Sequence, residues 1–108
     1  PFKDLFFSNI FFTDSVDAII KILDKKIPGK FHLSGDKDYS YERFANKIIN
    51  KFGFNKKLVK PILSKEINVN LIYNNNITSL DMSLTNKKLN LKPIKINKII
   101  NFLYLNFN

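Results

Sequence analysis

The sequence predicts a small α/β or α+β lobe with three principal helices and two or three short strands. Its 108 residues suffice for one domain with one core, but not for two. A hydrophobic fraction of 44% and an aromatic fraction of 14% supply enough apolar surface to offset the entropy lost on folding. Stretches of helical periodicity alternate with short extended runs, without a repeat or a low-complexity linker. We therefore expect residues 1–108 to form a single unit.

The N-terminal quarter of the chain predicts a strand, a helix and a turn. An aromatic and β-branched run at residues 6–12 favours a strand. Thr13 and Asp14 suit a helix N-cap, and the residues beyond them place four apolar side chains on one helical face: Val16, Ile19, Ile20 and Leu23. We expect this helix to end near the basic pair at residues 25–26, before Pro28 and Gly29 turn the chain.

The next stretch predicts a short strand followed by an amphipathic helix. Apolar and polar residues alternate through residues 30–34, and Gly35 supplies a turn after them. The helix has Ser40 at its N-cap position and Gly53 where a C-terminal glycine belongs. Between these two residues, one face is apolar: Tyr41, Phe44, Ala45, Ile48, Ile49 and Phe52.

The middle of the chain predicts little regular structure. Residues 58–62 are expected to be extended, because the residue before Pro61 is pushed toward β or polyproline geometry. Residues 64–67 can form one helical turn, and the Asn-rich residues 68–76 predict a loop. Residues 77–82 alternate as a short strand does.

Two further helices are expected near the C-terminus. Asp81 or Ser83 is the expected cap of a short helix that ends near Leu89. Beyond Pro93, a terminal helix is predicted by one apolar face: Ile96, Ile99, Ile100, Leu103 and Phe107. So small a sheet leaves apolar edges and faces open, and we expect a larger domain upstream of Pro1 to cover them.

The charge of the chain is high but dispersed. A formal net charge of +9 attracts phosphates in general. Nucleic-acid surfaces cluster their charge and use arginine forks, whereas Arg43 is the only arginine here and no lysine run exceeds two. The lack of cysteine excludes disulfides and thiolate metal sites and favours the cytoplasm, and no apolar run is long enough to span a bilayer. We expect no nucleic-acid partner and no membrane partner.

Motifs for catalysis and cofactor binding are missing from the sequence. The spacing of the three glycines fits neither a dinucleotide fingerprint nor a phosphate-binding loop. His32 and Ser34, with Asp36 or Asp38, lack the nucleophile elbow of a catalytic triad, so His32 is expected as a half-buried strand side chain. The two carboxylates are assigned to a turn and to the N-terminal end of a helix. We expect no catalytic, cofactor-binding or metal-binding residue in this chain.

The order of several short motifs is more informative than any one of them. A helix start at Asp14 is followed by "GKFHLSG" at residues 29–35, by "YSYERFA" at residues 39–45 and by "SLDMSL" at residues 79–84. This series, from about residue 7 to residue 91, resembles the C-terminal part of the dTDP-4-dehydrorhamnose reductase family, the RmlD-like branch of the extended short-chain dehydrogenases. The resemblance implies the substrate-binding lobe of an NAD(P)-binding Rossmann-fold enzyme, with the Rossmann core mostly absent from these residues.

The resemblance also implies a function. The family reduces a 4-keto-6-deoxy nucleotide sugar, a precursor of cell-surface polysaccharide, with NADPH or NADH. The cofactor and the Tyr-x-x-x-Lys pair that protonates the carbonyl belong to an N-terminal Rossmann domain, so no cofactor is expected on the lobe alone. On the lobe, the resemblance implies substrate contacts from four residues: Asn9, Phe11, Asn74 and Ser79. The parent enzyme is expected to be cytoplasmic, with a homodimer as one possible assembly.

One departure and one alternative accompany this resemblance. Family members carry Arg-Pro a few residues before the Ser-Leu-Asp element, where this chain has Asn74 and Asn75. The change removes a cation that faces the phosphates, although asparagine amides can still donate hydrogen bonds. The same fold also serves as the non-catalytic regulatory β subunit of methionine adenosyltransferase. An upstream glycine fingerprint with Tyr-x-x-x-Lys favours a reductase, and the loss of both favours a regulatory subunit.

Overall fold

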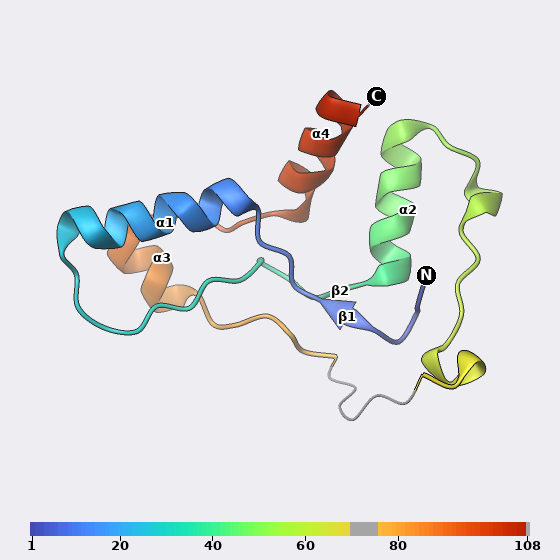
Figure 1. Ribbon diagram of the computed structural model, residues 1–108, viewed down its shortest axis with the longest axis horizontal. Helices are drawn as coiled ribbons and strands as arrows, with labels where there is room; N and C mark the ends of the chain where they lie inside the picture. The colour runs from blue at the N-terminus through green and yellow to red at the C-terminus, as the bar shows by residue number, and fades with distance from the viewer. Residues whose placement is uncertain (70–75, 108) are drawn as a thin grey trace.

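In the computed structural model, which describes residues 1–69 and 76–107, helices flank a two-stranded antiparallel sheet (Figure 1). Phe6 pairs with Ser40 and Phe7 with Tyr39. α1 lies against α3 on one side of the sheet, and α2 lies against α4 on the other. The elements in chain order are β1 (Phe6–Phe7), α1 (Phe12–Lys25), β2 (Tyr39–Ser40), α2 (Tyr41–Phe52), η1 (Lys56–Leu58), η2 (Ser64–Ile67), α3 (Ser83–Leu89) and α4 (Ile96–Phe107). This mixed content agrees with the predicted α+β class.

The helix α2 is the element that the sequence predicts most completely. The Ser40 hydroxyl accepts a hydrogen bond from the backbone N–H of Arg43 at 3.2 Å, so it caps the N-terminus as expected. Gly53 ends the helix in the left-handed conformation, with φ of 72°, and its N–H donates to the carbonyl of Ile49. The apolar face of α2 packs on the core formed by Tyr39, Ile96 and Ile100, which also includes Phe7, Phe44, Ile48 and Ile99.

The start of α1 differs from the prediction. The helix begins at Phe12, its N-cap is Phe11, and no side chain caps it. A cap by Thr13 or Asp14 is therefore wrong, because both residues already lie inside the first turn. The carboxylate of Asp14 instead forms an ion pair with Lys98 of α4. The predicted strand at residues 6–12 is correspondingly shorter, since β1 covers only Phe6–Phe7.

Two predicted strands do not form. Residues 30–34 and 77–82 lie within the described chain and have no strand pairing. Their backbone N–H groups bind side chains instead: His32 N–H donates to the Thr85 hydroxyl at 3.1 Å, and Leu80 N–H donates to the Ser34 hydroxyl at 3.1 Å. His32 is consequently an exposed loop residue, which corrects its prediction as a half-buried strand side chain.

Several shorter predictions are confirmed in whole or in part. Of residues 58–62, which were expected to be extended, Leu58 lies in η1, whereas Val59 is extended and Ile62 forms a parallel bridge with Phe2. Residues 64–67 form a single 3₁₀ turn. The short helix α3 ends at Leu89 as expected, although its N-cap is Met82, and the Asp81 carboxylate accepts from Ser83 N–H at 2.9 Å. Most of the predicted loop at residues 68–76 falls outside the described residues.

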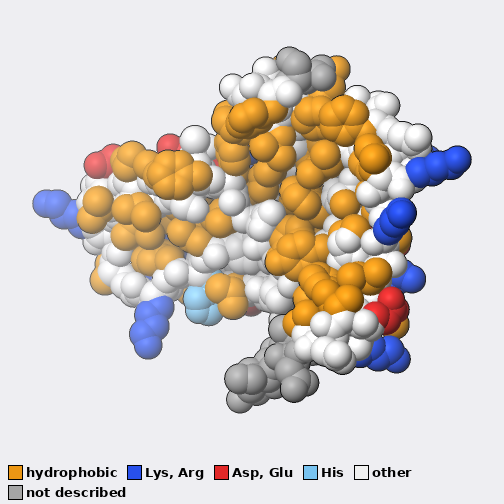
Figure 2. All heavy atoms as spheres, turned by 45° about the vertical axis from the view of Figure 1, so that its right-hand side comes forward, with side chains coloured by type: hydrophobic (Ala, Val, Ile, Leu, Met, Phe, Trp, Pro, Cys, Tyr) orange, Lys and Arg blue, Asp and Glu red, His pale blue; other side chains and the backbone are white. Residues whose placement is uncertain are grey.

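The molecule is thin and leaves apolar surface open. Its principal extents are 49 × 37 × 16 Å, and its radius of gyration of 16.5 Å exceeds the value of about 13 Å for a compact chain of this length. On α1, Ile19 is 51% exposed and Leu23 is 68% exposed, while only Ala18 is buried. Figure 2 shows hydrophobic side chains gathered over α1 and over α4. None of the described helices has the length and apolar character needed to cross a membrane.

Candidate functional site

The buried hydroxyl of Ser34 joins three separate segments of the chain. Ser34 is 5% exposed, and its Oγ lies 3.0 Å from Ser8 Oγ. It donates to the carbonyl of Gly35 at 3.2 Å and accepts the Leu80 N–H at 3.1 Å. This hydroxyl therefore ties residues 8, 34 and 80 together.

Gly35 sits where a larger residue does not fit. A Cβ at this position would lie 2.4 Å from the backbone oxygen of Asn9 and 2.9 Å from Ser8 Oγ. The chain at residues 8–9 therefore passes directly against the loop at residues 34–35. The glycine that the sequence assigns to a turn has a second role, which is to allow this close approach.

Asp38 fixes the segment that contains Ser79. Its carboxylate accepts from Thr78 N–H at 2.6 Å, Thr78 Oγ1 at 2.7 Å, Ser79 N–H at 2.8 Å and Ser79 Oγ at 2.7 Å. Desolvation acts to raise the pKa of Asp38, but the hydrogen bonds from Thr78 and Ser79 outweigh it and lower the pKa to about 2. Asp38 lies two residues before the N-cap Ser40, near the helix start where it was expected, and its carboxylate has the further role of binding residues 40 and 41 positions away.

A second carboxylate makes a similar contact. Asp4 accepts from the Ser64 N–H at 3.0 and 3.1 Å and from the Ser64 hydroxyl at 2.6 Å. The bond from the Ser64 hydroxyl is the main reason that the pKa of Asp4 lies below its usual range, and burial opposes it. Asp4 and Asp38 thus anchor Ser64 and residues 78–79, which stand on either side of residues 70–75 in the sequence.

A small pocket opens beside Ser34. It has a volume of about 270 Å³, and its polar lining includes Asp36, Asp81 and Asn86. Asn86 Oδ1 is buried and has no hydrogen-bond partner among the described residues. Carboxylate and amide oxygens are acceptors, so this pocket is suited to a ligand that carries hydroxyl groups. Pro93 and Ile94 form its wall on the side of α4.

The four residues expected to contact substrate fall in different places. Asn9 and Ser79 are half-buried and adjoin Ser8 and Leu80, two of the residues that bond the Ser34 hydroxyl. Phe11 instead packs its ring 5.0 Å from that of Phe102, which places it in the contact between α1 and α4. Asn74 lies outside the described residues. The structure therefore brings together the segments of Asn9 and Ser79, and it places Phe11 against α4.

Sequence reasoning missed most of the polar residues that build this region. The bonds of Asp4 and Asp38 join positions 60 and 40 residues apart, and no local pattern marks such pairs. Asn86 lies on α3 without any motif of its own. Asp81 belongs to the Ser-Leu-Asp element, but the sequence predicts it only as a helix cap. Within residues 1–69 and 76–107, no three acidic or histidine side chains lie close enough together to hold a metal ion.

Comparisons with protein-family models, with curated proteins and with solved structures find no match to this chain.

Proposed function

We propose that this chain is the substrate-side lobe of a nucleotide-sugar reductase similar to dTDP-4-dehydrorhamnose reductase. The observation that carries the proposal is the convergence on Ser34. The motifs whose order suggests the family are far apart in the sequence, yet Ser34, Gly35 and Leu80 meet at one hydroxyl together with Ser8. A shared structural role for the motifs at residues 29–35 and 79–84 supports the proposal.

The pocket beside Ser34 supports a sugar as the ligand. Asp36, Asp81 and the amide of Asn86 present acceptors around a volume of about 270 Å³. Hydroxyl groups of a deoxyhexose are donors that match such acceptors, and a site built for them rejects analogues that lack them. In the proposed enzyme these residues hold the sugar ring in place, while Asn9 and Ser79 border the same region.

The exposed apolar surface supports a second domain. The accessible surface is 7957 Å², whereas a compact protein of 12.6 kDa exposes about 6,200 Å². Ile19, Ile20 and Leu23 form an open face on α1, and Leu105 and Phe107 are exposed on α4. Such faces are typical of surfaces that another domain covers. We assign that role to a Rossmann domain that binds NADPH or NADH, which supplies the hydride when bound.

The experiment compares this chain with the product of the longer reading frame that includes it. NADPH oxidation is followed with a dTDP-4-dehydro-6-deoxy sugar as the second substrate. The chain alone should be inactive, and the longer protein active. In the longer protein, Asp36→Asn and Asp81→Asn should raise KM for the sugar nucleotide with a smaller effect on kcat, because they weaken binding rather than hydride transfer. Asp24→Asn, on the exposed surface of α1, is the matched control.

Two results would contradict the proposal that this chain belongs to a reductase. One is NADPH oxidation by the 108 residues alone, since the cofactor site is assigned to another domain. The other is a longer reading frame that lacks both the glycine fingerprint and Tyr-x-x-x-Lys, which would favour a non-catalytic regulatory subunit of the same fold. The size of the longer protein in solution tests the homodimer separately.

A further inference from the structure

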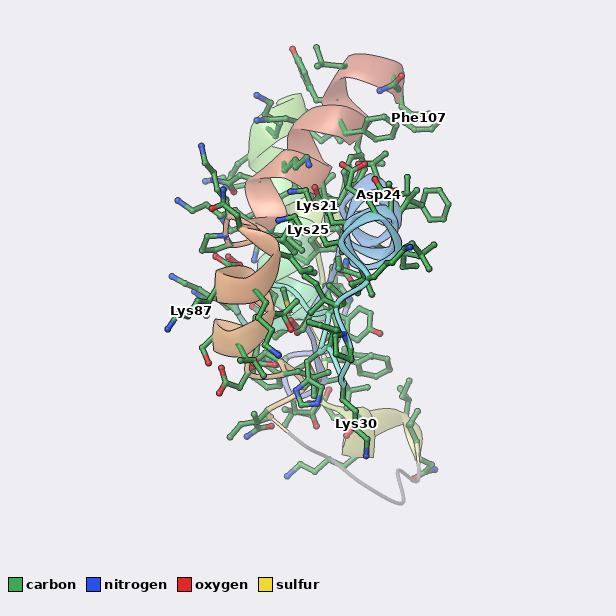
Figure 3. All side chains as sticks on the ribbon, turned by 90° about the vertical axis from the view of Figure 1, so that its left-hand side faces the viewer. Lys21, Asp24, Lys25, Lys30, Lys87 and Phe107 are labelled. Carbon is green, nitrogen blue, oxygen red and sulfur yellow. The ribbon has the colours of Figure 1, made fainter. Side chains whose placement is uncertain are left out.

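A wide groove lies between α1 and the residues that lead into α4. Its volume is about 690 Å³, which falls within the range of roughly 300 to 1,000 Å³ that is usual for small-molecule sites. Lys21 of α1 lines one side, and Lys92, Lys95 and Lys98 line the other. In Figure 3, Lys21 lies on the side of α1 nearest α3 and α4, opposite the side to which Phe107 projects.

The charges of this groove are unequal. Its four lysines face two carboxylates, those of Asp14 and Asp17. Asp14 is already paired with Lys98. Lys21, Lys92 and Lys95 therefore have only Asp17 as a further carboxylate within the groove, and no ion pair joins them to it in the described structure. The positive charges of these lysines repel one another. An anion bound among them would reduce this repulsion and would be attracted to each lysine.

Part of the groove lining is apolar. Leu91, Pro93 and Ile94 form this part, and Ile94 is 6% exposed. A lining that combines lysines with apolar residues fits a small molecule that has a multiply charged end and a less polar body. A polymer that followed the general charge of the chain would instead contact lysines outside this groove, such as Lys56 and Lys57 of η1.

We propose that the groove between α1 and residues 90–98 binds a small phosphorylated molecule, with its phosphate groups among Lys21, Lys92 and Lys95. This site is separate from the proposed sugar pocket, because its lysines do not line that pocket. Pro93 and Ile94 form a wall that the two sites share. The proposal does not depend on the reductase, since it uses none of the residues that the motif resemblance identifies as substrate contacts.

The test is a titration of the 108-residue chain with inorganic pyrophosphate, followed by ¹H–¹⁵N NMR. Binding should saturate, and the shifted amides should lie at residues 14–21 and 90–98. Lys21→Gln combined with Lys95→Gln should weaken binding by about tenfold, as expected for the loss of two charge-assisted contacts. Lys56→Gln combined with Lys57→Gln removes the same net charge outside the groove and should change the affinity by less than about twofold.

A variant that is expected to strengthen binding excludes loss of folding as the cause of weaker binding. Asp17→Asn removes a negative charge from the groove and should tighten pyrophosphate binding, whereas Asp24→Asn on the same helix should have no effect. Unsaturable binding, equal weakening by both lysine pairs, or shifts that extend over η1 would overturn the site and indicate general attraction of polyanions. Equal effects of the two aspartate variants would overturn it as well.

Discussion

The carboxylate of Asp38 shows how much one residue can organise in this chain. It receives four hydrogen bonds from two consecutive residues, Thr78 and Ser79. No sequence pattern links Asp38 to Thr78 and Ser79, because residues 40 positions apart share no periodic signal. The sequence predicts the capping residue at a helix end, as it does at Ser40. It does not predict a carboxylate contact between residues so far apart in the chain.

Acid should release the Asp38 contact. Its pKa in the folded protein is about 2, below the ordinary value of 3.8, so its contribution to stability is complete above about pH 4 and is lost as the pH falls toward 2. Since solvent screens this partly accessible group, we expect the contribution to be about 1 kcal/mol, less than the full pKa shift implies. Urea unfolding of the native chain and of Asp38→Asn, compared across this pH range, measures it.

The two proteins should differ at neutral pH and converge near pH 2. Asp24→Asn is a control on the exposed surface of α1. A constant difference between the native chain and Asp38→Asn down to the lowest pH would show that the carboxylate charge does not stabilise the segment at Thr78 and Ser79.

Replacement of Gly35 should be costly for a different reason. Gly35→Ala places a Cβ 2.4 Å from the Asn9 backbone oxygen, and backbone cannot move aside as a flexible side chain can. We expect a loss of about 2 to 3 kcal/mol in the free energy of unfolding. Gly53→Ala meets no atom within 4 Å and is strained only by its φ of +72°, so it should cost about 1 kcal/mol. Thermal unfolding that ranks Gly53→Ala as the more damaging change would contradict the close approach at Gly35.

Among the secondary-structure elements, the helices were largely predictable, whereas of the predicted strands only the one at residues 6–12 forms, shortened to β1. α2 has a local signal at each end and a continuous apolar face, so the sequence determines it without reference to the rest of the molecule. Residues 30–34 alternate as a strand does, but alternation does not supply a partner strand. Thr85 binds the His32 N–H, and Ser34 binds the Leu80 N–H, so side chains replace the ladder that the pattern suggested.

The two helix starts make a paired prediction. Ser40→Ala removes the bond to Arg43 N–H and should destabilise the protein by about 1 kcal/mol. Thr13→Ala should change stability by less than about 0.5 kcal/mol, because Thr13 is exposed and α1 has no side-chain cap. Chemical denaturation of both variants measures the difference. Equal losses of stability in the two variants would indicate that Thr13 caps α1, and they would contradict a helix start at Phe12.

At the scale of the whole molecule, the apolar residues divide into two sets that the sequence does not distinguish. Ile100 of α4 is 3% exposed, whereas Leu23 of α1 is 68% exposed, although both lie on an apolar face of a helix. Helical periodicity identifies such faces, but it does not say whether the chain itself covers them. Only the three-dimensional arrangement shows that α2 covers the inner face of α4 and that the apolar face of α1 stays open.

This division predicts opposite effects for two similar substitutions. Leu23→Gln combined with Ile19→Gln should leave the free energy of unfolding of the 108-residue chain within about 0.5 kcal/mol, because both side chains already face solvent. Ile100→Gln should cost about 3 kcal/mol or more, because it buries an amide in the core. In the longer protein, the α1 variant should lose stability as well, since the proposed second domain covers that face. Unfolding of both proteins by urea separates these cases. If the α1 variant is as stable as the native sequence in both proteins, no domain covers this face, and the proposal that the chain is one lobe of a larger enzyme loses the support of the exposed apolar surface.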